Sequence, residues 1–251
     1  MSAQDAELTR KNRFVNKDVT DFQDANASPI EGYELLTIST LEEAVQRIIS
    51  IVPKLLDYVT AAKKNCKRDS TILTIDESAS IYLYTMGTGF YSSLNRALRV
   101  KDRHELKPWF GFLKLFITAL NKLPSVQTIV WRGVNTNVTF DFIEDELQTW
   151  WSVNSCSKCI DIIQPYLSET GTIFNIQVIN GKDVHTYSAF EVEDEIILVP
   201  GTRLRVKSKP LNYNNSLFIV QLEEEKAELV PKIQRLVYLK SSMKCDELTN
   251  R

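Results

Sequence analysis

The pattern of apolar residues changes character about halfway along the chain, near Pro124. Before this point apolar residues recur three or four positions apart, which predicts amphipathic helices whose apolar stripes face a core. After it they gather in short segments rich in β-branched and aromatic side chains, which predicts strands. The helical stripes occupy residues 41–59, 75–86, 90–98 and 106–120.

Local signals mark where two of these helices begin. Ser39 stands three residues before Glu42, and Thr74 three residues before Glu77, which is the spacing of a helix-capping box. Pro53 lies inside the first stripe and predicts a kink or a break there. The N-terminal half is therefore predicted to be helical.

The second half carries five predicted strands and two turn signals. Asn180-Gly181 and Pro200-Gly201 are dipeptides typical of turns between strands. Because helices gather in the first half and strands in the second, the predicted fold class is α+β rather than an alternating βαβ arrangement. The predicted strands are 128–134, 172–179, 196–199, 204–207 and 216–222.

Composition divides the chain into an arm, one domain and a tail. Residues 1–30 are polar and are predicted to form a loose arm. The domain spans residues 31–225, with a helical part over 39–122 and a β-rich part over 126–223. Residues 226–251 form a C-terminal tail that no motif explains.

Charge and hydropathy argue against two classes of partner. The formal net charge is −2, so the chain lacks the basic excess of proteins that grip nucleic acid by its phosphates, and no nucleic-acid partner is predicted. No window approaches about 18 consecutive apolar residues, so no membrane span is predicted. The N-terminus is charged and lacks the apolar run of a secretory signal, so a cytoplasmic location is the expectation.

Two cysteines have the spacing of a metal or redox motif. Cys156 and Cys159 spell C-x-x-C, but a zinc site needs two more ligands, and the other cysteines and histidines are scattered. A thioredoxin-like motif would sit at a strand-to-helix step of a βαβ unit, which the pattern does not predict. We interpret the pair as a chance spacing of thiols and predict no metal. The glycine-rich fingerprints of dinucleotide folds and P-loops are absent from the sequence.

Arg132 lies within an otherwise apolar predicted strand, Val130-Trp131-Arg132-Gly133-Val134. A buried arginine is costly unless its guanidinium meets an anion, and its fork of donors suits a phosphate. Gly133 beside it lets a ligand approach the backbone closely. The alternative, an edge strand with Arg132 in solvent, is the commoner case for such a residue taken alone.

Two further polar clusters follow in the β-rich half. Paired tryptophans precede small hydroxyl residues in the segment 150–157, which suits either a pocket wall with a few polar groups or a core strand followed by a turn. Glu193 and Glu195 flank Asp194, and an extended backbone would point both glutamates to one face, where they can stabilise a cation. The alternative is an acidic turn on the surface.

In this order, the segments resemble those of the arginine-specific mono-ADP-ribosyltransferases, the class with a conserved arginine, serine and glutamate. The Arg132 strand resembles the first strand of the family, and Ser155-Cys156-Ser157 resembles its Ser-Thr-Ser strand. Glu193-Asp194-Glu195 resembles its E-x-E turn, and a helix with Asn95 and Arg99 four residues apart precedes the arginine strand as in the family. The resemblance implies an N-terminal helical subdomain packed on a split β-sandwich.

The resemblance implies a role for each matching residue. Glu195 would bind a ribose hydroxyl of NAD and stabilise the oxocarbenium-like transition state, Glu193 would orient or deprotonate the acceptor, and Ser155 would steady the nicotinamide ribose and hold Glu195 in place. Arg132 completes the implied catalytic set. The residues implied to bind NAD are Asn95, Arg99, Arg132, Gly133, Ser155 and Tyr166.

The implied activity is transfer of ADP-ribose from NAD to an exposed arginine of a protein acceptor. NAD would be consumed as a co-substrate, with no other cofactor and no metal. In the family, glutamate at the place of Glu193 accompanies arginine acceptors, and a carboxylate suits a guanidinium. Cys156 and Asn154 depart from the usual residues and weaken the assignment of Ser155. An NAD glycohydrolase and a non-catalytic NAD-binding or interaction module stay open as alternatives.

Overall fold

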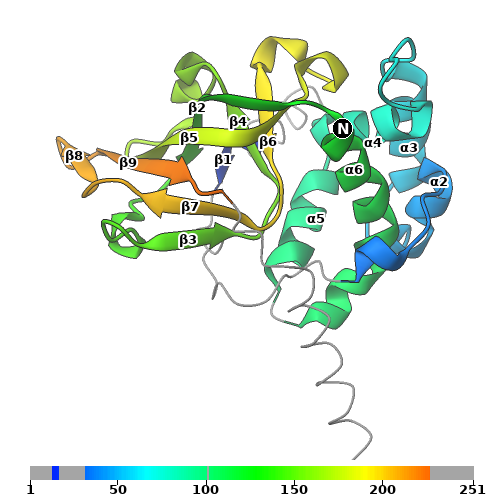
Figure 1. Ribbon diagram of the computed structural model, residues 1–251, viewed down its shortest axis with the longest axis horizontal. Coiled ribbons are helices and arrows are strands. Elements are labelled where there is room, and N and C mark those ends of the chain that lie inside the picture. The colour runs from blue at the N-terminus through cyan, green and yellow to red at the C-terminus, as the bar shows by residue number, and fades with distance from the viewer. Residues whose placement is uncertain (1–12, 17–31, 101, 227–251) are drawn as a thin grey trace, which may run out of the picture.

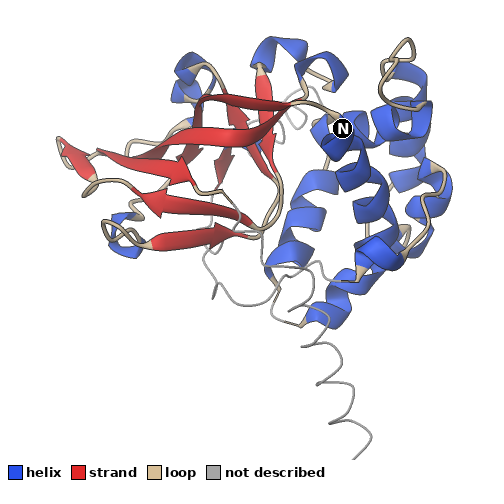
Figure 2. Cartoon of the chain, viewed as in Figure 1, coloured by secondary structure: helices blue, strands red, loops and turns tan. Residues whose placement is uncertain are grey.

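The structure is a computed structural model that describes residues 13–16, 32–100 and 102–226, and it has a helical half and a strand half (Figure 1). The α-helices gather on one side of the molecule, and the strands curve beside them with short 3-10 helices around them (Figure 2). Apart from the two-residue strand β1 (Val15–Asn16), the α-helices precede the strands along the chain, which confirms the α+β prediction. Short 3-10 helices lie between the strands. In the part of the chain that the structure describes, no helix is long and apolar enough to cross a membrane.

The helical half packs around one apolar core. Within it the ring of Phe112 contacts two others, with centroids 4.7 Å apart for Phe90 and Phe112 and 5.4 Å apart for Phe112 and Phe116. The α-helices are α2 (Leu41–Ala44), α3 (Leu55–Asn65), α4 (Ile75–Thr85), α5 (Phe90–Arg99) and α6 (Phe110–Lys122). Short 3-10 helices in this half are η1 (Tyr33–Leu35), η2 (Gln46–Ile48) and η3 (Arg103–Trp109).

The two predicted capping boxes agree with the structure to within one residue. Thr74 and Glu77 form a capping box at the start of α4, as predicted. The other box consists of Thr40 and Glu43, one residue later than predicted, because Thr40 is the extended residue that precedes α2. The predicted break at Pro53 is present, since α2 ends at Ala44 and α3 starts only at Leu55.

Among the described residues, nine strands form one sheet, which curves strongly (Figure 1). Their order is β1-β2-β4-β6-β5-β9-β7-β3; β8 also pairs with β9, and β2 with β5. The pairs β1–β2 and β5–β9 are parallel and the others antiparallel. The strands are β2 (Ser125–Val134), β3 (Leu147–Trp150), β4 (Asn154–Ser157), β5 (Gly171–Asp183), β6 (Glu195–Leu198), β7 (Thr202–Val206), β8 (Leu211–Tyr213) and β9 (Leu217–Glu224).

One predicted turn is present and the other is wrong. Pro200-Gly201 separates β6 from β7, and Gly201 has a φ of +88°, which glycine adopts readily. Asn180-Gly181 instead lies inside β5, where the strand bends to reach β6. The Glu224 carboxylate accepts the N–H of Asn180 there at 2.9 Å, so a side chain supplies the partner that a hairpin turn would have supplied.

The strand half has its own core, and Trp150 belongs to it. The Trp150 ring meets the Phe174 ring edge-on at 5.3 Å, and both are buried. The predicted aromatic and hydroxyl segment is therefore divided, because Trp150 ends β3 and the hydroxyl residues lie on β4. The core alternative is correct for Trp150.

The N-terminal arm is partly ordered against the sheet. Val15 pairs with Gly133 across β1 and β2, and Phe14, Val15 and Ile163 form a small buried cluster. The prediction of a loose arm is wrong for residues 13–16, because two apolar side chains and a strand pairing anchor them. Residues 1–12 and 17–30 of the predicted arm, and the tail after residue 226, lie outside the described residues.

Candidate active site

Arg132 lies on β2 and is buried, with 2% of its surface exposed. Its Nη1 donates to the main-chain oxygens of Ser155 and Arg13, each at 2.6 Å. The solvent-facing alternative is therefore wrong, since β2 pairs with β4 and β5 and is not an outer edge at this position. Among the described residues no acidic side chain forms an ion pair with Arg132, so its charge is available to an anion.

Glu193 and Glu195 converge through a turn rather than an extended strand. Glu193 ends the 3-10 helix η8 (Glu191–Glu193), Asp194 adopts a left-handed φ of 45°, and Glu195 begins β6. Both glutamates are buried, whereas the side chain of Asp194 is 52% exposed. The prediction that the two glutamates share a side is correct, but the left-handed residue, not strand alternation, produces it.

A guanidinium lies between these two carboxylates. Arg13 Nη1 donates to Glu195 Oε2 at 2.9 Å and to Glu195 Oε1 at 3.1 Å, and Arg13 Nη2 donates to Glu193 Oε2. Burial lowers the pKa of Arg13, but the charges of Glu195 and Glu193 outweigh it and raise that pKa overall. The carboxylate pair therefore forms a seat that binds a guanidinium.

Two serine hydroxyls bond to the glutamates, and that of Ser155 bonds elsewhere. Ser157 Oγ donates to the main-chain oxygen of Glu193 at 2.8 Å, and Ser188 Oγ donates to Glu195 Oε2 at 3.2 Å. Ser155 Oγ lies 3.4 Å from the Tyr84 hydroxyl, and no contact of its hydroxyl with Glu195 is among those described. The serine that holds Glu195 here is Ser188. The sequence reasoning assigned it no role, although it opens the same acidic segment.

Asn95 and Arg99 reach from α5 to the segment before β4. The Asn95 amide both donates to and accepts from the main chain of Val153, at 3.0 Å each way, and Arg99 Nη1 donates to Ser152 Oγ at 3.3 Å. The two residues lie on one helix face, as their spacing predicts. Their contacts place the start of β4, and thereby Ser155, relative to the helical half.

Gly133 and Tyr166 lie beside the ordered part of the arm. A Cβ on Gly133 would come within 3.0 Å of side-chain atoms of Leu167, Ile163 and Val15, so a larger residue would require these side chains to shift. Tyr166 ends the 3-10 helix η6 (Gln164–Tyr166) and packs on the cluster of Phe14, Val15 and Ile163. Both residues therefore border the same small apolar cluster.

Burial changes the acidity of groups beside the site. It raises the pKa of the Tyr84 hydroxyl to about 12, and that of the Cys156 thiol to about 12. Cys156 is a free thiol on β4, and Cys159 is free and partly exposed. Within the described ranges no three metal-ligating side chains lie close enough together to hold a metal ion.

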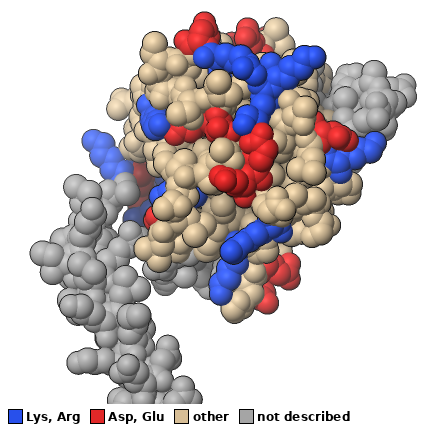
Figure 3. All heavy atoms as spheres, turned by 90° about the vertical axis from the view of Figure 1, so that its right-hand side faces the viewer, with Lys and Arg blue, Asp and Glu red and all other residues tan. Residues whose placement is uncertain are grey.

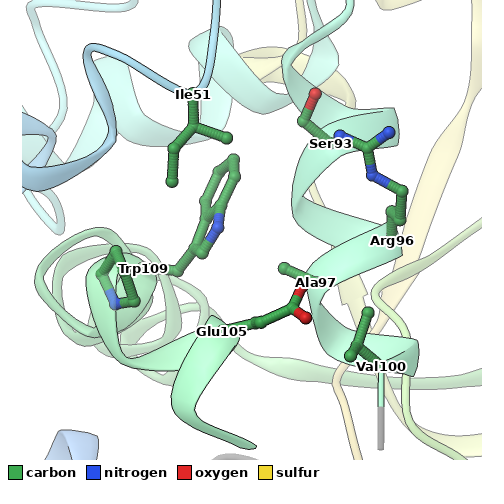
Figure 4. A pocket seen from close by; sticks show the side chains of 8 residues that line it. Ile51, Ser93, Arg96, Ala97, Val100, Glu105 and Trp109 are labelled. Carbon is green, nitrogen blue, oxygen red and sulfur yellow. The ribbon is translucent and has the colours of Figure 1, made fainter. Parts of the chain in front are cut away.

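A separate pocket opens on the other face of α5. It has a volume of about 240 Å³ and is lined by Ser93, Arg96 and Ala97 of α5 and by Val100, the residue after this helix (Figure 4). Asn95 and Arg99 instead bond to the segment before β4. On the neighbouring helical surface, charged side chains of both signs are intermingled, with no single-sign patch (Figure 3). The pocket is completed by Ile51, Glu105, Pro108 and Trp109.

Comparison with solved structures defines the class of fold. The eucaryotic mono-ADP-ribosyltransferase ART2.2 aligns at a TM-score of 0.57 with 19% identity, over 89% of this chain and 98% of that one. The Vis toxin of Vibrio splendidus, an ADP-ribosyltransferase, aligns at 0.54 with 17% identity, over 80% and 92% of the two chains. HopU1 of Pseudomonas syringae pv. tomato, also an ADP-ribosyltransferase, aligns at 0.51 with 15% identity, over 90% and 98%. The fold is that of the ADP-ribosyltransferases.

The sequence narrows this class to a family. Residues 58–228 match the sequence profile of the NAD:arginine ADP-ribosyltransferases, which is more than half of the chain. The chain belongs to this family and is an NAD-dependent mono-ADP-ribosyltransferase. No curated protein sequence matches it.

Proposed function

We propose that the enzyme transfers ADP-ribose from NAD to the guanidinium of a protein arginine, with release of nicotinamide. The observation that carries the proposal is the buried pair Glu193 and Glu195 with a guanidinium seated between the carboxylates. Charge-assisted bonds of this kind select an arginine over a neutral acceptor. In support, the ADP-ribosyltransferase Vis has been crystallised with agmatine, a small guanidinium compound.

In this proposal Arg132, Ser155 and Glu195 act on NAD. Arg132 binds a phosphate near the nicotinamide ribose, and Ser155 steadies that ribose. Glu195 accepts a hydrogen bond from a ribose hydroxyl and stabilises the positive charge that spreads over the ribose as the glycosidic bond breaks. NAD is consumed in the reaction, and the proposed chemistry uses no further cofactor.

The remaining residues of the proposed site bind and orient the two substrates. Gly133 offers its main chain to the nicotinamide amide, and Tyr166 stacks on the nicotinamide ring. Arg99 holds the diphosphate. Asn95 contributes by fixing Val153, since both ends of its amide are already bonded there. In this proposal the strands form a split β-sandwich, and the helices form an N-terminal subdomain that packs on it.

In the transfer step one bond to ribose C1′ breaks, another forms, and one proton is released. The bond between ribose C1′ and the nicotinamide nitrogen breaks, and the electron pair leaves with nicotinamide. A guanidinium nitrogen of the acceptor then bonds to C1′ and loses a proton to Glu193, which releases it to solvent. Glu193 therefore both orients the acceptor and serves as the base.

Replacement of Glu195 by glutamine tests the proposal. We expect Glu195→Gln to lower the rate of ADP-ribose transfer to an arginine-rich protein by on the order of 10² to 10³, because one electrostatic partner of the transition state is lost. Glu191→Gln, an exposed carboxylate four residues away, is the matched control and should keep the wild-type rate.

The assay follows labelled ADP-ribose on the acceptor and free ADP-ribose in solution in the same reaction. Labelled ADP-ribose on an arginine of the acceptor protein, formed by the wild-type enzyme, supports the transferase. Release of free ADP-ribose only would replace the transferase with a glycohydrolase, and full activity of Glu195→Gln would remove Glu195 from the mechanism.

A further inference from the structure

The guanidinium that fills the carboxylate seat belongs to the protein's own N-terminal arm. Arg13 lies 182 positions from Glu195 in the sequence, and its side chain is fully buried. Its guanidinium carbon also lies 5.8 Å from the centroid of the Phe190 ring, which adds a cation–π contact. An acceptor arginine and Arg13 cannot occupy this seat at the same time.

The backbone of the same segment covers the residues proposed to bind NAD. The main-chain oxygen of Arg13 accepts a hydrogen bond from Arg132 Nη1 at 2.6 Å. This N–H group is therefore not available to a phosphate of NAD while the arm is in place. Val15 pairs with Gly133, and its side chain closes the space beside that glycine. Ligand and arm therefore compete for the same groups.

The seat does not satisfy Arg13 completely. Arg13 Nε is buried and has no hydrogen-bond partner among the described residues. An orphaned buried donor carries a free-energy penalty, which weakens the hold on the arm. The arm contributes only a two-residue strand, β1, to the sheet. The unbonded Nε and the short strand both weaken the binding of the arm, so the arm can leave the site.

We infer that residues 13–16 are an internal pseudosubstrate, which closes the site with Arg13 in the acceptor seat and β1 over Gly133. The inference rests on the proposed function, because it requires that NAD and an acceptor arginine bind here. The enzyme is active only in molecules whose arm has left the site, and NAD and the arm exclude each other.

Two variants of the full chain release the arm by different means. Arg13→Ala removes the guanidinium, and Val15→Asp places a charge in the buried cluster while it keeps Arg13. We expect the KM for NAD to fall roughly tenfold in both, as for a site that is open in about one molecule in ten. Arg47→Ala, an exposed arginine on η2, is the control and should keep the wild-type KM.

A peptide supplied separately tests the arm without relying on a variant's stability. A peptide of residues 11–17 should inhibit the Arg13→Ala enzyme in competition with NAD. The same peptide with alanine at the place of Arg13 should inhibit much less. Inhibition by neither peptide, with a wild-type KM in both variants, would overturn the inference and make the arm a structural strap.

The outcomes separate this inference from the proposed function. If calorimetry detects no NAD binding to the wild-type chain, Arg13→Ala or Val15→Asp, the proposed function is wrong and the inference is wrong with it. If the wild-type chain and both variants bind and turn over NAD equally, the function stands and the inference fails. ADP-ribose on Arg13, formed at a rate independent of chain concentration, would also overturn it, because NAD and the seated arm would then coexist.

Discussion

The helical half and the strand half satisfy their buried polar groups in different ways. In the helical half, the buried Glu77 bonds to the nearby Thr74 in a cap and to Lys122 of α6 at 2.6 Å. In the strand half, Glu193 and Glu195 meet a partner from the far end of the chain. A cap and an ion pair with a lysine whose side chain is 41% exposed stabilise the helices. Three charged side chains that tertiary structure buries together mark the place where chemistry is expected.

If this contrast is correct, damage to the helical core should reduce stability and leave the chemistry intact. Phe112 is fully buried and touches two other rings, so Phe112→Ala should lower the free energy of unfolding by about 3–5 kcal/mol. Urea unfolding measures this loss, and nicotinamide release per folded molecule should remain at the wild-type rate.

Phe140 provides the matched control for that experiment. It is 84% exposed on the 3-10 helix η4 (Thr139–Asp141), so Phe140→Ala should change the free energy of unfolding by no more than about 0.5 kcal/mol. A large loss of turnover in folded Phe112→Ala would show that the helical core does more than support the site.

A buried serine in each half sharpens the contrast. Ser157 Oγ donates to the oxygen of Glu193 and accepts the N–H of Cys159 at 3.1 Å. Ser157→Ala leaves both groups buried without this partner, so we expect a loss of about 1–3 kcal/mol in stability. Because the hydroxyl anchors Glu193, the kcat for transfer should also fall, more than the KM for NAD changes.

Ser80 is the corresponding serine of the helical half. Its hydroxyl donates to the oxygen of Glu77 within α4 at 2.7 Å, a bond that competes with the helix rather than supporting it. Ser80→Ala should therefore leave stability and kcat near their wild-type values. Equal losses of kcat in the two variants would contradict the division between the halves.

The sequence predicts most of the helical half because its signals are local. The Thr74 capping box and the break at Pro53 depend on residues a few positions apart. The strand half depends on long-range pairing, and there the same reasoning fails. Asn180-Gly181 has the composition of a turn, but Glu224, 44 positions away, satisfies its backbone and keeps it in a strand.

The candidate site shows the same limit. Arg132, Glu193 and Glu195 could be found because a charge in an apolar strand, or a pair of carboxylates at its start, is conspicuous. Ser188 could have been found only as the hydroxyl that opens the acidic segment. Arg13 gave no signal, because one arginine in a polar arm resembles any other until the fold brings it to Glu195.

The smallest predicted effect concerns a neutral group in the strand core. Burial raises the pKa of the Cys156 thiol to about 12 from a usual value of 9.0. Between these values the unfolded chain has lost the thiol proton and the folded chain keeps it, so the folded state binds more protons and stability falls as pH rises. One such proton is worth about 1.4 kcal/mol per pH unit.

Cys156→Ala removes this proton, so its stability should decline less steeply above pH 9 than that of the wild-type chain, by the slope of one proton. Val130→Ala truncates another fully buried side chain of the same core without removing a titratable group, so it should be less stable but keep the wild-type slope. Urea unfolding at a series of pH values measures both slopes. Parallel slopes for all three proteins would show that the thiol ionises as readily in the folded chain as in the unfolded one, and that this core tolerates a charge next to Arg132.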